Sequence, residues 1–580
     1  MEALVMSMDR TGVAGVLEQI ASCLELQGQN PFRVRAFRGA AKAVLGLSVD
    51  PAQALADGSL GAIKGIGPAT VGIVKELVEG GRCEMLEQLR EETPPGLVEM
   101  LRISGLGITR IRAIHEKLGI ETLAELEDAA RDGRLAALPG FGTKTAATVL
   151  KGLAFVRRVQ AFRLSHHAAE EAELLRSALQ RLPGVSRALV AGEVRRRTEV
   201  VRDLIIVLVA ELPADEVFRS LAQVPGLEEI AGEDERRVTL RTPGGMAARV
   251  VVTPAVNLGA VLVQATGSDA HLERLSAHAA TVGFGLNAAA LWKGSAFVAT
   301  PDEAALYGAL GLAEIPPEVR EGSDEIERAR NGALPRLVED GDLAGMLHCH
   351  SKYSDGSLTV EQLALACREA GYSYVGLTDH SQAAAYAGGL SVDDLHRQWA
   401  EIDVFNASTS GIRVLKGIES DILMDGRLDY DDDTLAGFDF VIGSIHSRFA
   451  MVEAEMTERI LRVMDSPYLT ILGHPTGRLL LSRDPYPIDL ERVFAKAAAN
   501  RIAIEINADP HRLDLDWRHV RRARELGVMI SIGADAHSRA GLANMHYGVG
   551  MARKGWLTRA EVLNTRTADE FLAFARARRP

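Results

Sequence analysis

The sequence predicts a multidomain protein with an all-α N-terminal part, an α/β middle part and a C-terminal barrel of alternating strands and helices. Three observations predict this order. Three Gly-x-Gly turns interrupt helical patterns before residue 160, short strand-like runs begin after Leu182, and seven apolar runs alternate with helical patterns after residue 343. The chain has 580 residues, more than one hydrophobic core can use, so several domains are expected.

The composition excludes several classes of protein. With 47% hydrophobic and 25% charged residues the chain is typical of soluble globular proteins, and no apolar run is long enough to cross a membrane. Residues 1–12 lack the pattern of a signal peptide, and the four cysteines lack paired spacing. The net charge of −13 argues against a surface covered in basic patches, although backbone amides bind phosphates without basic side chains. We expect a cytoplasmic protein with reduced thiols and no membrane partner.

The N-terminal part is predicted to consist of helices joined by a repeated turn. Apolar residues recur at three- and four-residue spacing over residues 11–55, with a turn at residues 30–32. Gly-x-Gly turns that each open a helix follow at residues 63–70, 103–108 and 138–144. The glycines allow a tight turn, and the amides at the next helix N-terminus can face a phosphate. The alternative is a helical bundle whose turns simply need glycine.

These three turns resemble helix-hairpin-helix motifs. Such motifs bind the DNA backbone, so the resemblance implies gapped, nicked or primer–template DNA as the partner, held by contacts without sequence specificity. The residues expected at the DNA are Gly65, Gly67, Gly105, Gly107, Gly140, Gly142 and Lys144.

The middle part carries a polar pattern between predicted strands. The strands are expected at residues 188–192, 203–209, 238–240 and 248–252. The polar positions are Gly192, Arg195, Arg196 and Asp203. This pattern resembles the palm of family X DNA polymerases, which has Gly-Ser, a basic pair, Asp-x-Asp and a third Asp on a later strand. In that family the three carboxylates hold two magnesium ions for nucleotidyl transfer.

Two of the expected palm carboxylates are missing. Glu193 replaces the serine, Ile205 replaces the second aspartate and Ala247 stands at the third. Residues 264–271 resemble the family's nucleotide-pocket segment but lack the Tyr-Phe pair that usually precedes its Thr-Gly-Ser, here residues 266–268. Isoleucine and alanine supply no ligand atom, so we predict that Mg²⁺ binding and polymerase activity are weak or lost. The alternative is that Glu193 or Asp234 substitutes as a ligand.

The C-terminal part is predicted to be a seven-stranded parallel barrel, because seven apolar runs alternate with helical patterns. The runs are residues 346–347, 374–377, 414–418, 440–445, 469–472, 502–506 and 528–532. Such barrels carry their chemistry at the C-terminal strand ends. Nine residues with metal-binding side chains lie there: His348, His350, Asp355, His380, Glu419, His446, His474, Asp535 and His537. Burying them would be costly unless a cation binds them.

Local spacing also supports shared metal binding. His348 and His350 are two residues apart, as are Asp535 and His537, so each pair is expected on one face of a strand. The nine residues resemble the trinuclear centre of PHP phosphoesterases, with every position of that pattern filled. The resemblance implies one metal at His348, His350, Glu419 and Asp535, a second at Glu419, His446 and His474, and a third at Asp355, His380 and His537.

The expected cofactors are up to three Zn²⁺ or Mn²⁺ ions, because mixed imidazole and carboxylate ligands suit these better than Ca²⁺ or Mg²⁺. Glu419 and Asp535 are the expected catalytic ligands. Arg448 and Arg478, each just past a ligand strand, are candidate phosphate clamps. The alternative for each is an ordinary solvated arginine.

The order of parts resembles bacterial family X DNA polymerases with a C-terminal PHP domain. We predict a helical domain over residues 1–85, a second over 86–160, palm and thumb over 161–312, a linker over 313–342 and the PHP barrel over 343–580. The expected function is DNA repair by a monomer that acts as a 3′–5′ exonuclease or 3′-end processing enzyme. The alternatives are a gap-filling polymerase, a small-molecule phosphatase and a non-catalytic DNA-end scaffold.

Overall fold

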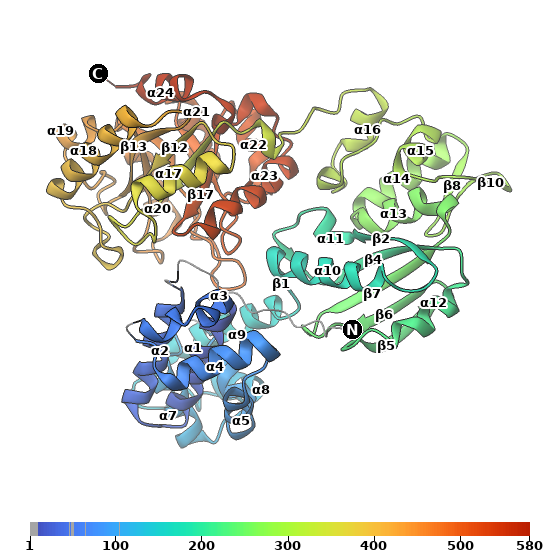
Figure 1. Ribbon diagram of the computed structural model, residues 1–580, viewed down its shortest axis with the longest axis horizontal. Helices are drawn as coiled ribbons and strands as arrows, with labels where there is room; N and C mark the ends of the chain where they lie inside the picture. The colour runs from blue at the N-terminus through green and yellow to red at the C-terminus, as the bar shows by residue number, and fades with distance from the viewer. Residues whose placement is uncertain (1–9, 46, 48–50, 64, 104, 580) are drawn as a thin grey trace. The chain divides into compact units, whose positions relative to one another are not determined.

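The computed structural model describes residues 10–579 except 46, 48–50, 64 and 104. The chain forms two compact units, Met1–Ala161 and Phe162–Pro580 (Figure 1). Lys64 and Ser104, which belong to two of the Gly-x-Gly turns, lie outside the described residues. None of the helices in the described part of the chain is long and apolar enough to span a membrane.

The first unit is helical, as predicted, and encloses two clusters of buried apolar side chains. The turn expected at residues 30–32 is present, because the Asn30 side chain accepts a hydrogen bond from the Phe32 amide at 2.9 Å and Pro31 opens the second helix. The helices are α1 (Arg10–Leu26), α2 (Pro31–Leu45), α3 (Pro51–Ala56), α4 (Pro68–Gly80), α5 (Glu84–Glu92), α6 (Pro95–Met100), α7 (Ile108–Leu118), α8 (Leu123–Arg131) and α9 (Thr143–Val159).

The three Gly-x-Gly turns share one backbone geometry. In each turn an amide donates to the carbonyl oxygen three residues earlier, at 3.0 Å for Ile66 to Ile63, Leu106 to Ile103 and Phe141 to Leu138. The first glycine of each turn has a positive φ, of 100° at Gly65, 86° at Gly105 and 84° at Gly140. Side chains rarely adopt this conformation, so the repeat requires glycine there.

The second glycine of each turn caps the following helix. Gly67, Gly107 and Gly142 precede α4, α7 and α9, and none of these caps has a side chain that accepts the helix amides. A helix N-terminus without such a cap leaves its first amides available to an external anion. Lys144 is exposed in the first turn of α9.

The second unit begins with an α/β half built on a sheet in the order β2-β4-β7-β6-β5, in which β4 and β7 are parallel. Both faces of β4 are buried, since Val207 and Val209 cluster with Val261 of α13 while Ile206 and Leu208 are fully covered. This explains its unbroken apolar sequence. The strands are β1 (Arg163–Leu164), β2 (Val185–Ala191), β3 (Val200–Val201), β4 (Leu204–Ala210), β5 (Glu228–Asp234), β6 (Arg237–Arg241), β7 (Ala247–Thr253), β8 (Phe284–Leu286), β9 (Leu291–Lys293) and β10 (Ala296–Val298).

Seven α-helices accompany this sheet in the described chain before the barrel begins. They are α10 (Ser165–Leu179), α11 (Gly192–Arg195), α12 (Ala214–Leu221), α13 (Leu258–Thr266), α14 (Asp269–Thr281), α15 (Glu303–Ala309) and α16 (Glu325–Arg330). Several features differ from the prediction, which did not contain β1, β3, β8, β9 or β10. Gly192, expected in a strand, begins α11 with a φ of 66°. The edge strand β5 was not expected, because its sequence is charged and contains glycine.

The segment expected to be a linker, residues 313–342, is packed against the α/β half. Ile315, Val319 and Ile326 belong to a buried apolar cluster together with side chains of α13 and α15. Arg320 is fully buried and pairs with Glu303 at 2.7 Å. A buried guanidinium needs such a partner, so this segment is part of the folded structure.

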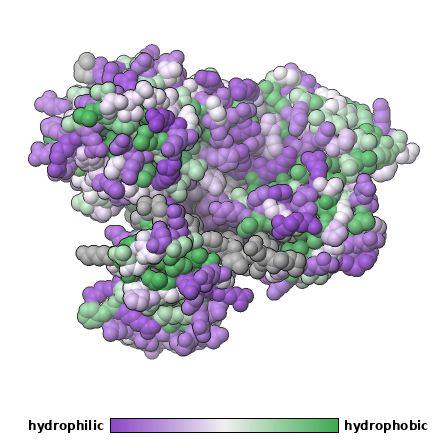
Figure 2. All heavy atoms as spheres, viewed as in Figure 1, coloured by the Kyte–Doolittle hydropathy of each residue, from purple (hydrophilic) through white to green (hydrophobic). Residues whose placement is uncertain are grey.

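The predicted (β/α)7 barrel is confirmed: seven strands form a closed barrel in chain order, and each neighbouring pair is parallel. The visible face of this part is mainly hydrophilic (Figure 2). The strands are β11 (Gly345–Cys349), β12 (Tyr374–Leu377), β13 (Arg413–Asp421), β14 (Phe440–Ser444), β15 (Leu469–Leu472), β16 (Ala503–Asn507) and β17 (Ile530–Ala536).

Aromatic side chains fill the barrel at the N-terminal ends of its strands. The ring of Phe571 in α24 lies 5.2 Å from that of Phe440 and 5.9 Å from that of Tyr374. A Cβ atom at Gly376 or Gly417 would lie 2.5 Å from the Phe440 ring, so glycine makes room for it. The helices are α17 (Val360–Glu369), α18 (Val392–Ser408), α19 (Asp432–Ala436), α20 (Glu453–Val463), α21 (Leu490–Ala499), α22 (Trp517–Glu525), α23 (Met545–Lys554) and α24 (Ala568–Arg576).

Candidate metal centre

The nine predicted ligands lie at one rim of the barrel. Three of them end or lie within strands, namely His348 in β11, Glu419 in β13 and Asp535 in β17. The others follow their strands directly or in the next loop: His350, Asp355, His380, His446, His474 and His537. Because all strands are parallel, these positions meet at the same end of the barrel.

The carboxylate of Glu419 is the centre of this cluster and is 1% exposed. Its Oε1 atom lies near three imidazole nitrogens, at 3.0 Å from His474 Nε2, 3.2 Å from His446 Nε2 and 3.4 Å from His348 Nε2. Its Oε2 atom lies 3.0 Å from His380 Nδ1 and 3.7 Å from His350 Nε2. One buried carboxylate therefore contacts five imidazoles from four different segments of the chain.

Asp535 is the second buried carboxylate. Its Oδ1 atom lies 3.3 Å from His350 Nε2 and 3.7 Å from His348 Nε2. The two histidines reach it as expected, but not through a regular strand. His348 has a φ of 61° and Asp535 a φ of 49°, and the register of β11 shifts next to His348. The convergence therefore depends on left-handed residues as well as on strand alternation.

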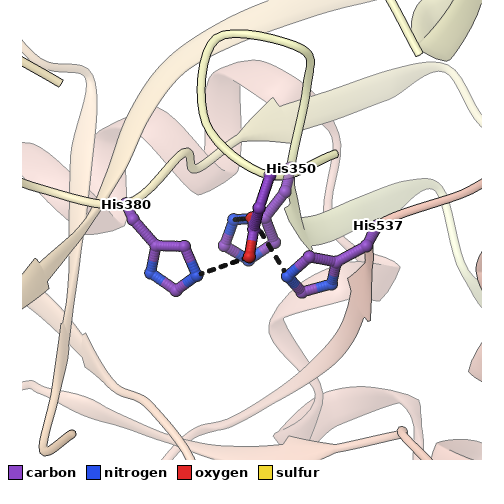
Figure 3. A group of neighbouring side chains, drawn as sticks. His350, His380 and His537 are labelled. Atoms are coloured by element: carbon purple, nitrogen blue, oxygen red, sulfur yellow. Dashed lines mark ion pairs between the residues drawn. The ribbon is translucent and has the colours of Figure 1, made fainter. Parts of the chain in front are cut away.

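Asp355 joins three imidazoles on the outer side of the cluster. Its oxygens lie 3.3 Å from His537 Nε2, 3.7 Å from His380 Nε2 and 3.9 Å from His350 Nδ1. Figure 3 shows the three rings directed towards this carboxylate. The rings of His350 and His537 are stacked, with centroids 4.2 Å apart.

The distances group the donors somewhat differently from the predicted metal sets. Donor atoms lie within 4.8 Å of one another in three groups: His350, Asp355, His380 and His537; His348, His350 and Asp535; and His380, Glu419 and His446. His350 thus joins the predicted third set and His380 the second. His474 contacts Glu419 but belongs to none of these groups.

Several buried polar atoms of the cluster have no hydrogen-bond partner in the described part of the chain. They are His348 Nε2, both ring nitrogens of His350, His380 Nδ1, Glu419 Oε2 and His474 Nδ1. A buried polar atom without a partner is costly, and a bound cation would remove that cost. The imidazole and carboxylate donors therefore fit divalent transition-metal ions.

A further layer of carboxylates, which the sequence analysis did not identify, fixes the imidazole rings. Glu505 Oε1 lies 2.5 Å from His348 Nδ1, and its Oε2 accepts a hydrogen bond from the His474 amide at 2.7 Å. Asp421 Oδ1 lies 2.6 Å from His446 Nδ1. The contacts to His348 Nδ1 and His446 Nδ1 direct the other nitrogen of each ring towards the cluster. The signal was available, since both carboxylates lie near the ends of barrel strands.

Charges in the cluster shift pKa values in opposite directions. Burial disfavours ionisation of Glu419, but His446, His348 and His380 together outweigh burial and hold the pKa of the carboxyl well below its usual value. Burial lowers the pKa of His446, but Glu419 and Asp421 raise it to about 10. Burial and the neighbouring His537 lower the pKa of His350 to about 3. A cation at His446 must therefore displace a proton, whereas His350 is a neutral donor.

The two predicted phosphate clamps have different positions. Arg448 is exposed two residues after His446, in a left-handed conformation. Arg478 is 6% exposed, and its guanidinium donates to the Arg512 and Leu513 carbonyls and to Asp516. These contacts hold the guanidinium against the backbone and Asp516, which argues against the predicted phosphate clamp at Arg478.

The palm-like half contains a separate cavity of about 660 Å³. Its lining includes the predicted positions Gly192, Arg196 and Asp203, together with Glu193 and Ile205. Burial raises the pKa of Glu193, whose carboxylate accepts a hydrogen bond from the Arg202 amide at 2.7 Å. The cavity thus keeps the predicted polar residues but contains a hydrocarbon side chain where a carboxylate ligand was expected.

The arginines of this half pair with acidic side chains. Arg195 lies 2.6 Å from Glu303, and Arg196 lies 3.2 Å from Glu321. Arg249 lies 3.8 Å from Asp203. Burial opposes ionisation of Glu303, but Arg195 and Arg320 lower its pKa to about 2. These basic residues therefore hold the palm together.

A parallel barrel with clustered imidazole and carboxylate donors defines a metal-dependent phosphoesterase of the PHP class, and residues 346–509 match the family described as PHP domain. Residues 8–83 match a helix-hairpin-helix domain, 97–154 a SAM-like helix-hairpin-helix tandem, and 261–321 the DNA polymerase beta thumb.

The whole chain resembles one kind of protein. It is 35% identical over 575 residues to the DNA polymerase/3′-5′ exonuclease PolX of Bacillus subtilis (strain 168), covering 98% of this chain and 99% of the relative. The chain therefore belongs to the PolX family, the bacterial family X DNA polymerases with a PHP domain.

Other relatives match only part of this chain. A probable phosphatase of Thermoanaerobacter sp. (strain X514) is 26% identical over 217 residues, which is 36% of this chain and 84% of that protein. A probable phosphatase of Aliivibrio fischeri (strain ATCC 700601 / ES114) is 32% identical over 174 residues, 28% of this chain and 67% of that protein.

Proposed function

We propose that this chain binds gapped or nicked DNA and hydrolyses phosphodiesters from the 3′ end in the barrel, while its palm transfers nucleotides weakly or not at all. One contrast supports this division. The barrel brings donors from several strands around Glu419, whereas Ile205 and Ala247 stand at two of the three expected palm ligands. The full-length relative is named for both activities, and we assign the hydrolytic one to the barrel.

The nine barrel residues are the proposed ligands of up to three Mn²⁺ or Zn²⁺ ions. When bound, such ions supply an activated water and neutralise the charge of the phosphodiester. Glu505 and Asp421 orient the imidazoles, and Glu419 and Asp535 provide the buried negative charge that the cations need. The exposed position of Arg448 is compatible with a phosphate contact.

The helix-hairpin-helix turns are the proposed DNA contacts. The open N-termini of α4, α7 and α9 offer amides to backbone phosphates, and Lys144 adds a positive charge to the third. We also propose that the chain acts as a monomer in the cytoplasm. The proposed domain boundaries are those predicted above, except that residues 313–342 are part of the folded structure instead of a linker.

The test uses a gapped duplex labelled at the 5′ end of the strand with the free 3′ end, incubated with Mn²⁺ with and without dNTPs. Shortening of the strand by the wild type and by Asp203→Ala, but not by Glu419→Ala, is expected. Lengthening that depends on Asp203 would contradict the proposed division.

A small-molecule phosphatase is the second candidate, because relatives that match about a third of the chain are named probable phosphatases. Turnover of a phosphate monoester with no digestion of DNA would favour it. Primer extension by a His348→Ala/His350→Ala variant would favour a gap-filling polymerase. A DNA-end scaffold would be indicated by DNA binding without cleavage and a metal-free barrel after growth with Mn²⁺ and Zn²⁺.

A further inference from the structure

An exposed tyrosine stands beside the metal-binding cluster. Tyr386 is 73% exposed, although its ring lies close to two proposed ligands. The ring centroid is 6.3 Å from that of His380 and 6.5 Å from that of His446. A planar apolar surface is thus presented to solvent at the edge of the cluster.

The loop that carries Tyr386 is fixed to the barrel. The Ser381 amide donates to the Glu419 carbonyl at 3.0 Å, and the Leu390 amide donates to the His380 carbonyl at 2.9 Å. Both ends of the loop are therefore held by the backbone of ligand residues. Tyr386 lies between them in a short 3-10 helix, Ala385–Ala387.

A guanidinium also reaches the cluster, and the sequence analysis did not identify it. Arg512 Nε lies 3.6 Å from Asp535 Oδ2, and the side chain is 23% exposed. The Arg512 carbonyl accepts a hydrogen bond from Arg478 Nε at 3.0 Å. Arg478 thus braces the loop that carries Arg512. Tyr386 lies beside His380 and Arg512 lies beside Asp535. Both of these ligands adjoin His350, so the two side chains border one cluster.

We propose that Tyr386 and Arg512 form a nucleotide-binding pair, in which the tyrosine ring stacks on the terminal base and the guanidinium holds the adjoining phosphate; this rests on the proposed hydrolysis of DNA 3′ ends. An aromatic face accepts any base, because every base has a π-face on which it can stack. Arginine binds phosphate oxygens through its forked donors. A small phosphate monoester gains only the second contact, so the pair selects polynucleotide ends.

The activity test compares two oligonucleotides, one with an ordinary 3′-terminal nucleotide and one with a 3′-terminal abasic tetrahydrofuran residue. The measured quantity is kcat/KM for the ordinary oligonucleotide divided by kcat/KM for the abasic one. Tyr386→Ala is expected to lower this ratio about tenfold, and Tyr386→Phe is expected to keep it. Phe297→Ala removes another exposed aromatic ring, on β10, and should leave the ratio unchanged. An unchanged ratio in Tyr386→Ala would overturn the stacking role.

A binding test does not depend on hydrolysis. The probe is an oligonucleotide with 2-aminopurine at its 3′ end and an uncharged methylphosphonate as the last linkage, added to the full chain with Mn²⁺. Wild type and Tyr386→Phe should quench the fluorescence on binding, and Tyr386→Ala should not. Equal quenching by all three would overturn the proposal. If quenching depends on Tyr386 but the protein digests no DNA, the proposed function is wrong and the proposed nucleotide-binding role of Tyr386 still holds.

Arg512 is tested through the phosphate charge. Arg512→Gln should weaken binding of the ordinary oligonucleotide about tenfold and have a much smaller effect on the methylphosphonate probe, with Arg512→Lys intermediate. Metal content is measured for each variant because Arg512 contacts Asp535. Equal weakening of both probes at equal metal content would overturn the phosphate contact.

Discussion

The barrel and the palm-like half differ in how many of the expected metal-binding side chains each contains. The barrel has a set of donors that meet around Glu419 and are oriented by a further layer of carboxylates. The palm has a folded sheet, a cavity and paired arginines, but Ile205 lies in the lining where a ligand was expected. The comparison teaches that a scaffold persists through core packing and ion pairs, while metal chemistry depends on a few carboxylates.

Loss of the central barrel carboxylate should have the largest effect. Glu419→Gln keeps the size of the side chain but removes a charge that contacts five imidazoles, so 3′–5′ digestion should fall by about 10³-fold or more. Rates are measured on the labelled gapped duplex. Asp203→Ala is the matched palm variant. A comparable loss of 3′–5′ digestion in this variant would contradict the assignment of hydrolysis to the barrel alone.

The ion pairs of the palm should matter for stability. The pKa of Glu303 is about 2 in the fold, against an ordinary value of 4.5. The charge of Glu303 therefore stabilises the fold above pH 4.5, and this contribution is lost as the pH falls towards 2. Glu303→Gln should cost about 3 kcal/mol at pH 7. Urea unfolding at pH 7, 4 and 3 should show the difference from wild type shrinking with pH. A constant difference would argue for packing instead of charge.

Removal of an outer barrel carboxylate should weaken metal binding without abolishing it. Glu505→Gln loses the charged partner of His348 and should reduce affinity for Mn²⁺ or Zn²⁺ by about 10–100-fold. Isothermal titration at constant pH measures this. Glu491→Gln, which alters an exposed surface ion pair on α21, is the control and should bind as wild type does.

Restoring carboxylates to the palm should give the smallest effect. The double substitution Ile205→Asp/Ala247→Asp returns the missing charges next to Asp203. We expect primer extension only a few-fold above background. Arg249 pairs with Asp203, and the surrounding side chains do not hold the new carboxylates in a metal-binding geometry. The assay uses a barrel-inactive Glu419→Gln background. Extension at a rate similar to the barrel's digestion would show that the two missing carboxylates are the only defect.

Much of the barrel could be predicted from sequence, because strands buried on both sides are continuous apolar runs and the ligands follow at their ends. The same reasoning missed β5, since an edge strand needs few apolar residues. It also treated residues 313–342 as a linker, because a fully buried Arg320 is indistinguishable in sequence from a solvated one.

Side-chain direction was the main limit at the site. Arg478 and Arg512 both follow barrel strands, yet one donates to the backbone and the other faces Asp535. Position after a strand does not decide between these outcomes. Glu505 and Asp421 also lie near strand ends but were passed over, because a carboxylate that orients an imidazole has no spacing pattern that separates it from other strand-end carboxylates.

The left-handed conformations of His348 and Asp535 have an evolutionary consequence. Such a conformation costs on the order of 1 kcal/mol or more for a residue other than glycine, and here it persists only because the side chain reaches the cluster. In a lineage released from selection for hydrolysis, replacement by glycine at either position would relieve that cost. The barrel could then lose its hydrolytic activity through mutations that stabilise its fold, and such mutations would be neutral or favoured.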